Sequence, residues 1–226
     1  DTDTFDTWFS SGQWPFATLE TTGDFRKFYP TSVMETGWDI LPFWVMRMIM
    51  LGLYVTGKAP FKYVYLHGLV RDKDRQKMSK SKGNVIDPLG VIDLYGADAL
   101  RMALVVGNTA GNDIIISEEK IKGYRNFANK IWNASRFVLM NLDGAQPAKP
   151  KKLNEDDKKI IKELQTTVKT VTRHLDRFEF HLASETLYHY FWHTFADKII
   201  ESQKERLQGV ERAAAQYLRY TILTTS

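Results

Sequence analysis

A long apolar run, ILPFWVMRMIMLGLYV over residues 40–55, limits the folds open to this chain more than any other segment. A helix that crosses a bilayer needs about 20 apolar residues, whereas this run is shorter and carries Arg47 near its middle. Asp39 stands where it can cap a helix, and Pro42 falls in the first turn, where proline is tolerated. The run therefore predicts a buried helix of a globular domain.

Short β-rich segments flank this helix on both sides. SVMET (residues 32–36) precedes it, with a turn at Gly37, and KYVYLHG (residues 62–68) follows it. Strand, turn, helix and strand in this order predict an α/β unit with a parallel sheet. Such sheets bind ligands beyond the carboxyl ends of their strands, which are expected here at residues 36–39 and 67–71.

From Pro88 onward the pattern is helical, with a break at Gly96. Ser117 followed by two glutamates is typical of a helix start, and residues 143–152 read as a linker rich in Pro, Ala and Lys. The predicted apolar helix faces consist of Ile121, Tyr124, Phe127, Ile131, Val138 and Leu142 before the linker, and of Ile160, Leu164, Val168, Val171, Leu175, Leu187, Tyr190, Phe191, Thr194 and Phe195 after it. The predicted fold class is α/β followed by all-α.

The composition is that of an ordinary globular protein of 226 residues, 43% of them hydrophobic and 26% charged. A net charge of +4 permits an anionic partner without requiring one. The chain has no cysteine, which excludes disulfides and thiolate metal sites and fits a reducing compartment.

One segment, RDKDRQKMSKSKGNVIDP over residues 71–88, concentrates lysine and serine before Gly83. Lysines are mobile point charges suited to phosphate oxygens, and hydroxyls and backbone N–H groups add donors. Cations placed around a polyphosphate stabilise charge that grows in a transition state. Most lysine-rich surface segments are only solvated loops, however, and composition alone favours that interpretation.

The order of residues within this segment changes the interpretation. K-M-S-K-S followed by K-G-N-V-I-D-P resembles the signature loop of the class I aminoacyl-tRNA synthetases. YLHGLVRD, TGWDILPFWVMRMIM, DTWFSSGQWPF, RKFYP, YGADALR and GYRNFANKIWNASRFVLMNL all resemble the valyl-tRNA synthetase family. The resemblance covers nearly the whole chain and is looser over the helices after the linker.

The resemblance implies a role for several residues. Lys77 and Lys80 would be catalytic, with Lys80 the lysine placed most directly on the ATP phosphates. The implied ATP-binding residues are Gly37, Asp39, His67, Gly68, Leu69, Lys77, Ser79, Lys80 and Ser81. The implied valine pocket consists of Trp8, Asp39, Ile40 and Trp44. Without the resemblance, plain core packing would be the better interpretation of Trp8 and Trp44.

The resemblance also implies a domain organisation. Residues 1–88 would form the C-terminal half of a Rossmann-like catalytic domain that includes the signature loop. Residues 89–150 would form a stem-contact region and linker, and residues 151–226 a truncated helical anticodon-binding domain. The implied ligands are valine, tRNA(Val), and ATP with Mg²⁺ as a substrate complex, without a protein-bound metal. A cytoplasmic monomer with no membrane contact is expected.

Other features depart from the family pattern. Trp38, Pro42 and Asn112 replace residues that are more usual in the family, which leaves details of the pocket and of the RNA contacts open. No H-x-G-H motif occurs, and no long editing insertion is present. The chain does not begin with Met and ends inside an apolar run, so we expect a fragment. Because the family's activation step needs the absent H-x-G-H motif, we expect that this fragment does not turn over alone. The alternatives are an isoleucyl- or leucyl-tRNA synthetase fragment, or a non-catalytic RNA-binding module derived from a synthetase.

Overall fold

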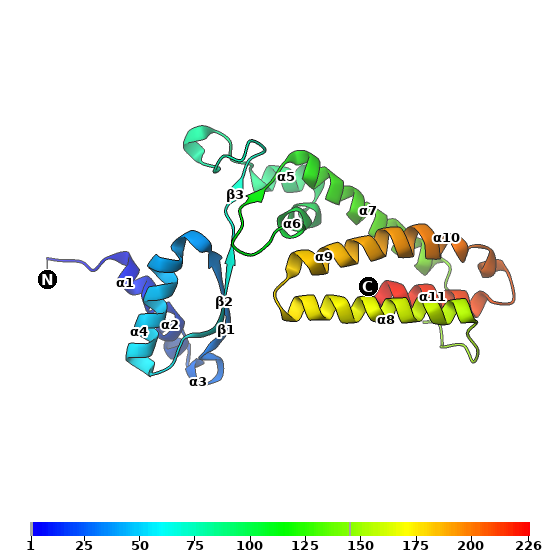
Figure 1. The fold of residues 1–226 in the computed structure, drawn as a ribbon, viewed down its shortest axis with the longest axis horizontal. Coiled ribbons are helices and arrows are strands. Elements are labelled where there is room, and N and C mark those ends of the chain that lie inside the picture. Colours follow the sequence, from blue (N-terminus) through cyan, green and yellow to red (C-terminus); the bar gives the residue numbers. More distant parts are fainter. Residues whose placement is uncertain (1, 145) are drawn as a thin grey trace. The chain divides into compact units, whose positions relative to one another are not determined.

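The computed structural model of the chain describes residues 2–144 and 146–226, and the side chain of Lys80 lies outside the described part. The chain divides into two compact units. The α/β unit comprises Asp1–Val70 and Thr109–Ile114, and the helical unit comprises Arg71–Asn108 and Ile115–Ser226. Their elements are labelled in Figure 1, and each unit is described by itself.

The α/β unit contains the predicted parallel strand pair. Strand β1 (Thr31–Gly37) pairs with β2 (Phe61–His67), and the register runs from Thr31 opposite Phe61 to Gly37 opposite His67. A continuous helical segment connects the strands, namely η1 (Trp38–Ile40), η2 (Leu41–Val45) and α4 (Met46–Thr56). The predicted strand–helix–strand unit is therefore confirmed, and both strands end at the same edge of the sheet.

The interpretation of the connecting helix as buried was wrong for most of its surface. Met48 and Val45 are fully buried against Met34 of β1, but Met50, Leu53 and Tyr54 are 58, 47 and 88% exposed. Two strands and three short helices can cover only one side of this helix. By length and composition alone the segment Trp38–Thr56 could cross a membrane, with mean hydropathy 1.4 and 17% of its residues buried, which is weak evidence by itself.

The start of this helical segment also differs from the prediction. Gly37, not Asp39, occupies the N-cap position, and no side chain caps the first turn. Asp39 already lies within that turn, because the chain passes from β1 into η1 without an intervening loop. Pro42 does lie at the start of η2, as expected for a residue that lacks a backbone donor.

Three short helices precede the sheet, namely α1 (Thr7–Gly12), α2 (Trp14–Thr22) and α3 (Phe25–Phe28). Asp6 caps α1 by accepting a hydrogen bond from the Trp8 backbone N–H at 2.7 Å. Gly12 packs closely on α4, since a Cβ at this position would lie 2.8 Å from Leu51 Cδ1. Of the three helices, α1 and α2 pack against α4.

The helical unit begins with the lysine-rich loop. The chain passes from one unit to the other within two short paired strands, β3 (Val70–Arg71) and β4 (Ile114–Ile115), and η3 (Lys80–Lys82) lies inside the loop. Helices α5 (Pro88–Tyr95) and α6 (Ala97–Val105) follow. They are separated at Gly96, whose φ of +89° is accessible mainly to glycine, so the predicted break is confirmed.

A helical bundle completes this unit. It consists of α7 (Glu118–Met140), α8 (Glu155–Asp176), α9 (Phe180–His189) with η4 (Tyr190–Ile199) and α10 (Ile200–Ser202), η5 (Glu205–Gln208), and α11 (Arg212–Thr225). Ser117 caps α7 as predicted, and Asn154 and Asp157 form a capping box at the start of α8. Local cap chemistry therefore sets where the two longest helices begin.

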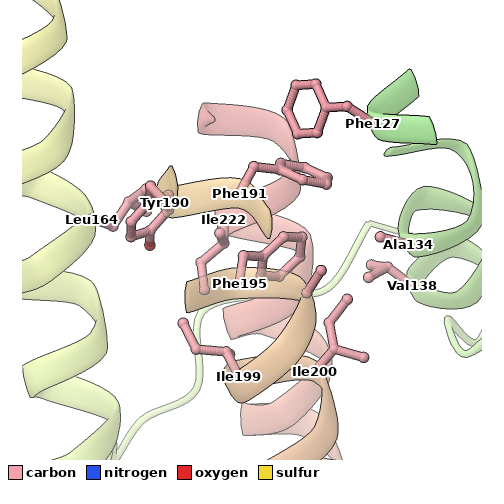
Figure 2. Packing of buried hydrophobic residues seen from close by; sticks show 11 residues of the cluster. Phe127, Ala134, Val138, Leu164, Tyr190, Phe191, Phe195, Ile199, Ile200 and Ile222 are labelled. Atoms are coloured by element: carbon pink, nitrogen blue, oxygen red, sulfur yellow. The ribbon is translucent and has the colours of Figure 1, made fainter. Parts of the chain in front are cut away.

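Aromatic and aliphatic side chains from four helices form the core of the bundle. Figure 2 shows Phe127 and Val138 of α7, Leu164 of α8, Phe195 of η4 and Ile222 of α11 in one cluster. Half of the predicted core positions are buried. Ile131, Val168 and Leu175 are 37, 36 and 47% exposed, and Leu142 lies beyond the end of α7.

One ion pair is buried inside the bundle. The Asp157 carboxylate, whose side chain is 1% exposed, accepts from Arg206 Nη1 at 2.7 Å and from Nη2 at 3.0 Å. The hydrogen bond that Arg206 donates to Asp157 is the main cause that raises the pKa of Arg206. This bidentate pair links the start of α8 to η5 and leaves neither charge uncompensated.

The position of the core predicts that the same Val→Ala substitution destabilises the protein at one site and not at another. Val138 is 1% exposed, whereas Val210 is fully exposed at 104%. Val138→Ala is expected to lower the free energy of unfolding by about 2 kcal/mol, because it removes buried methyl groups and leaves a cavity. Val210→Ala is expected to change it by less than about 0.5 kcal/mol. Urea unfolding followed by circular dichroism compares them, and equal losses would contradict this placement of the core.

Candidate functional site

The ends of β1 and β2 place three predicted site residues together in the α/β unit. Gly37 lies opposite His67 in the strand register, and Asp39 lies in the turn that follows. A Cβ at Gly37 would stand 2.7 Å from Asp39 Oδ1 and 3.6 Å from His67 Cε1. Glycine is thus the residue that allows the carboxylate to fold back over the strand end.

The imidazole of His67 has contacts on both of its nitrogens. Its Nδ1 lies 2.8 Å from the Gly68 carbonyl oxygen, and its Nε2 lies 3.4 Å from Glu35 Oε1. The ring is still partly exposed, with 43% of the side chain accessible to solvent. The geometry holds the imidazole at the sheet edge while leaving a face open.

A distant segment, residues 109–114, returns to this edge. The Gly111 N–H donates to the Leu66 carbonyl at 2.9 Å, and the Ile114 N–H donates to the Leu69 carbonyl at 2.8 Å. Gly68 is buried under the segment, since a Cβ there would lie 1.6 Å from the Asn112 carbonyl oxygen. No side chain can be accommodated at Gly68 without moving this backbone.

Asp113 in this segment is a site residue that the sequence analysis missed. Its Oδ1 accepts a hydrogen bond from Trp38 Nε1 at 3.0 Å and another from the Leu69 backbone N–H at 2.9 Å. One carboxylate therefore links the residue after β1 to the chain after β2. The only sequence signal was the departure noted at the neighbouring Asn112, and no spacing rule connects Asp113 with Trp38, 75 residues away.

The predicted valine-pocket residues lie in the same unit but have different partners. Trp44 stacks on Trp14 with ring centroids 5.8 Å apart and donates from Nε1 to the Ser11 carbonyl. Trp8 instead contacts the Phe43 ring at 6.3 Å and lies under the Arg47 guanidinium. The two tryptophans therefore do not share their ring contacts.

A cleft of about 360 Å³ lies beside Trp44. Its lining includes Trp14, Leu19, Val33 and Phe61, which makes it mainly apolar. Of the four predicted pocket residues, Trp44 lines this cleft, whereas Trp8, Asp39 and Ile40 are outside its described lining. Asp39 and Ile40 are half-buried in the η1 turn.

The lysine-rich loop lies in the helical unit and begins with a tight turn. Arg71 and Lys77 form an antiparallel bridge, and Asp72 Oδ1 accepts from the backbone N–H groups of Asp74 at 3.0 Å and Gln76 at 2.8 Å. Arg75 has a φ of +62°, a conformation that is uncommon for a residue with a side chain. The Asp72 carboxylate therefore holds a turn that the backbone alone would rarely adopt.

The other end of the loop is held by Asn84. Its Oδ1 accepts from the Ser79 N–H at 2.9 Å, and its Nδ2 donates to Asp72 Oδ2 at 2.7 Å. The hydrogen bond from Asn84, followed by the backbone hydrogen bond from Gln76, lowers the pKa of Asp72 below its usual value. The Asp72 carboxylate thus stays ionised within this network.

Two of the predicted phosphate-binding residues lie exposed on this loop. Lys77 and Ser81 are exposed, and Ser79 Oγ lies 3.2 Å from Ser81 Oγ. The predicted role of Lys80 concerns a side chain outside the described part, although its backbone belongs to η3. In the described part of the chain, no group of three His, Cys, Asp or Glu residues could hold a metal ion.

Comparison with known families gives a match for two segments of the chain. Residues 1–117 match the family of tRNA synthetases class I (I, L, M and V). Residues 157–226 match the anticodon-binding domain of tRNA ligases.

Comparison with individual proteins gives relatives of the same kind. The chain is 50% identical over 222 residues to a valine--tRNA ligase of Solibacter usitatus, which covers 96% of the chain. It spans 26% of that relative's length. The fold resembles the LeuRS–tRNA–LeuAMS complex of Agrobacterium radiobacter K84, with a TM-score of 0.79 and 23% identity over 100% of the chain and 30% of the solved one. It also resembles a Mycobacterium tuberculosis methionyl-tRNA synthetase bound by methionyl-adenylate, with a TM-score of 0.70 and 26% identity over 93% and 41%.

The close approach at Gly68 predicts opposite effects for two glycine substitutions. Gly68→Ala is expected to cost several kcal/mol, because its methyl group would overlap the Asn112 carbonyl. Gly123→Ala, inside α7 with nothing within 4 Å, is expected to stabilise by about 1 kcal/mol. Thermal unfolding of both variants tests this, and a Gly68→Ala variant as stable as the parent would refute the placement of residues 109–114.

Proposed function

Because the chain belongs to the class I tRNA synthetase family, we propose that it is part of a valine--tRNA ligase. The whole enzyme would activate valine with ATP to valyl-adenylate and then transfer the valyl group to tRNA(Val). The observation that carries this proposal is the 50% identity to a valine--tRNA ligase over 96% of the chain. The solved leucine and methionine enzymes, at 23 and 26% identity, are much more distant.

In the proposed first step, an oxygen of the valine carboxylate attacks the α-phosphorus of ATP. The bond between this phosphorus and the bridging oxygen of pyrophosphate breaks, and pyrophosphate leaves with Mg²⁺ as its counterion. In the second step a ribose hydroxyl of the tRNA attacks the valyl carbonyl carbon. The bond between this carbon and the phosphate oxygen breaks, the hydroxyl proton passes to the departing phosphate, and AMP leaves. Both steps need positioned cations and donors more than covalent chemistry from the protein.

The strand ends of the α/β unit are proposed to bind the adenosine. The peptide groups around Gly37, Gly68 and Leu69 are close to the sheet edge, where ligands of open parallel sheets bind. The carboxylate of Asp39 can accept a ribose hydroxyl, and the open face of His67 can contact the base. The two hydrogen bonds of Asp113 support this role, because they connect the Trp38 indole after β1 to the Leu69 backbone after β2.

The lysine-rich loop is proposed to bind the polyphosphate. Lys77 and Lys80 would neutralise the charge that develops on pyrophosphate, and the Ser79 and Ser81 hydroxyls would donate to its oxygens. The exposure of Lys77 and Ser81 supports this role, since neither side chain is committed to the core. Mg²⁺ would enter with ATP as part of the substrate.

Trp8, Asp39, Ile40 and Trp44 remain the proposed valine-binding residues. Two indoles and an aliphatic side chain suit a small branched substrate, and Asp39 can accept its ammonium group. Trp44 already lines an apolar cleft in this unit, which supports a pocket on its side of η2.

The remaining domain assignments are also proposals. Residues 1–88 would contribute half of the catalytic domain, residues 89–150 the stem contact and linker, and residues 151–226 part of the anticodon-binding domain. The exposed apolar side of α4 fits a chain that packs against further polypeptide of the same enzyme. The enzyme is proposed to be a cytoplasmic monomer that makes no membrane contact, and this chain alone is proposed to be inactive.

The function is tested by measuring ligand specificity. A non-hydrolysable valyl-adenylate analogue is expected to bind the ligase that contains this chain at least about tenfold more tightly than the isoleucyl analogue, because one added methylene must fit a small pocket. Isothermal titration calorimetry gives both affinities. Equal affinities, or a preference for the isoleucyl analogue, would exclude the valine assignment.

The proposed inactivity of the isolated chain is tested separately. Valine-dependent ATP–pyrophosphate exchange by this chain alone would refute it.

The loop lysines are tested by substitution in the same ligase. Lys77→Ala and Lys80→Ala are each expected to lower the exchange rate constant about 100-fold, because each removes a preorganised cation. Lys73→Ala is the matched control, since Lys73 is an exposed lysine at the turn of the same loop. A loss of the same size in all three variants would mean that only the overall charge of the loop matters.

A further inference from the structure

Two side chains close the lysine-rich loop without belonging to the proposed phosphate-binding set. Asp72 and Asn84 stand at the two ends of the loop, twelve residues apart, and Asn84 Nδ2 donates to Asp72 Oδ2 at 2.7 Å. Both residues are half-buried, whereas Lys77 and Ser81 between them are exposed. We call this hydrogen-bonded pair the clasp.

Each member of the clasp also fixes part of the loop backbone. Asp72 Oδ1 holds the turn by accepting from the N–H groups of Asp74 and Gln76. Asn84 Oδ1 accepts from the Ser79 N–H at 2.9 Å, and its Nδ2 also lies 3.4 Å from the Lys77 carbonyl. The backbone on either side of the proposed phosphate-binding residues is therefore attached to one side-chain pair.

We propose that Asp72 and Asn84 are positioning residues, whose clasp presets the backbone of residues 77–81 so that its lysines and hydroxyls meet the departing pyrophosphate without further ordering. This inference rests on the proposed function. A loop without the clasp would have to be ordered during the reaction, at a cost in conformational entropy. Donors that are already placed act with little reorganisation when the transition state forms.

The chemistry of the clasp allows a reciprocal test. In the parent, position 72 supplies acceptors only, and position 84 supplies one acceptor to Ser79 and one donor to position 72. Asn84→Asp puts two carboxylate oxygens face to face, and Asp72→Asn puts two amide donors face to face. The double variant Asp72→Asn/Asn84→Asp restores one donor and one acceptor between the positions and keeps the acceptors for Ser79, Asp74 and Gln76. It loses only the 3.4 Å contact of Asn84 Nδ2 with the Lys77 carbonyl.

Valine-dependent ATP–pyrophosphate exchange is measured for the four forms of the ligase that contains this chain. Each single variant is expected to lower kcat about tenfold with the KM for valine unchanged, and the double variant to recover most of the parent rate. Asp74→Asn is the matched control, because it removes the same charge from the same turn while only its backbone N–H takes part in the network. Its kcat should equal that of the parent.

Limited tryptic cleavage supplies a readout that does not depend on activity. The loop contains Lys77, Lys80 and Lys82 as cleavage sites, and the single variants are expected to be cut there several times faster than the parent and the double variant. Single variants with parental kcat, or a double variant no faster than Asn84→Asp, would overturn the proposal. Equal cleavage of all four forms would overturn it as well. A parent ligase without valine-dependent exchange would instead refute the proposed function, and cleavage would still decide whether the clasp orders the loop.

Discussion

The parallel pairing of β1 with β2 determines which residues can meet in the α/β unit. Its register sets Gly37 opposite His67, so both strands end at one edge although they lie 30 residues apart in sequence. A slip of one residue would turn every side chain of a strand to the other face. The segment 109–114 can return to this edge only because Gly68 leaves room for the Asn112 carbonyl. Backbone pairing and one absent side chain thus bring three distant pieces of chain together.

Features that depend on neighbouring residues could be predicted from the sequence. The alternation of strand, glycine turn and apolar helix gave the correct α/β unit, and Gly96 and Ser117 marked a helix break and a helix start where they were expected. These signals are local, because caps and turns depend on the chemistry of a few adjacent residues. The resemblance of the lysine-rich loop to the family's signature loop was evident from the order of its residues, not from its composition.

Features that depend on distant contacts were missed or misjudged. Nothing in the sequence pairs Asp113 with Trp38, because a carboxylate that accepts two hydrogen bonds leaves no periodic pattern. The apolar helix was expected to be buried, yet much of α4 is exposed. Apolarity shows that a surface avoids water but not whether this chain supplies its cover. Likewise, the aromatic character of Trp8 and Trp44 did not determine that they contact different aromatic partners.

The lysine-rich loop separates two tasks that a single residue performs poorly. A lysine that meets a polyphosphate must keep its charge accessible, and the exposed Lys77 does so at the end of a flexible side chain. The position of such a lysine must then be set by the loop backbone. Asp72 and Asn84 hold this backbone with short, half-buried side chains that are saturated with hydrogen bonds. A short side chain loses little conformational entropy when it is fixed, so it can hold a loop at lower cost than a lysine could. This division explains why a strongly cationic segment can still have a defined conformation.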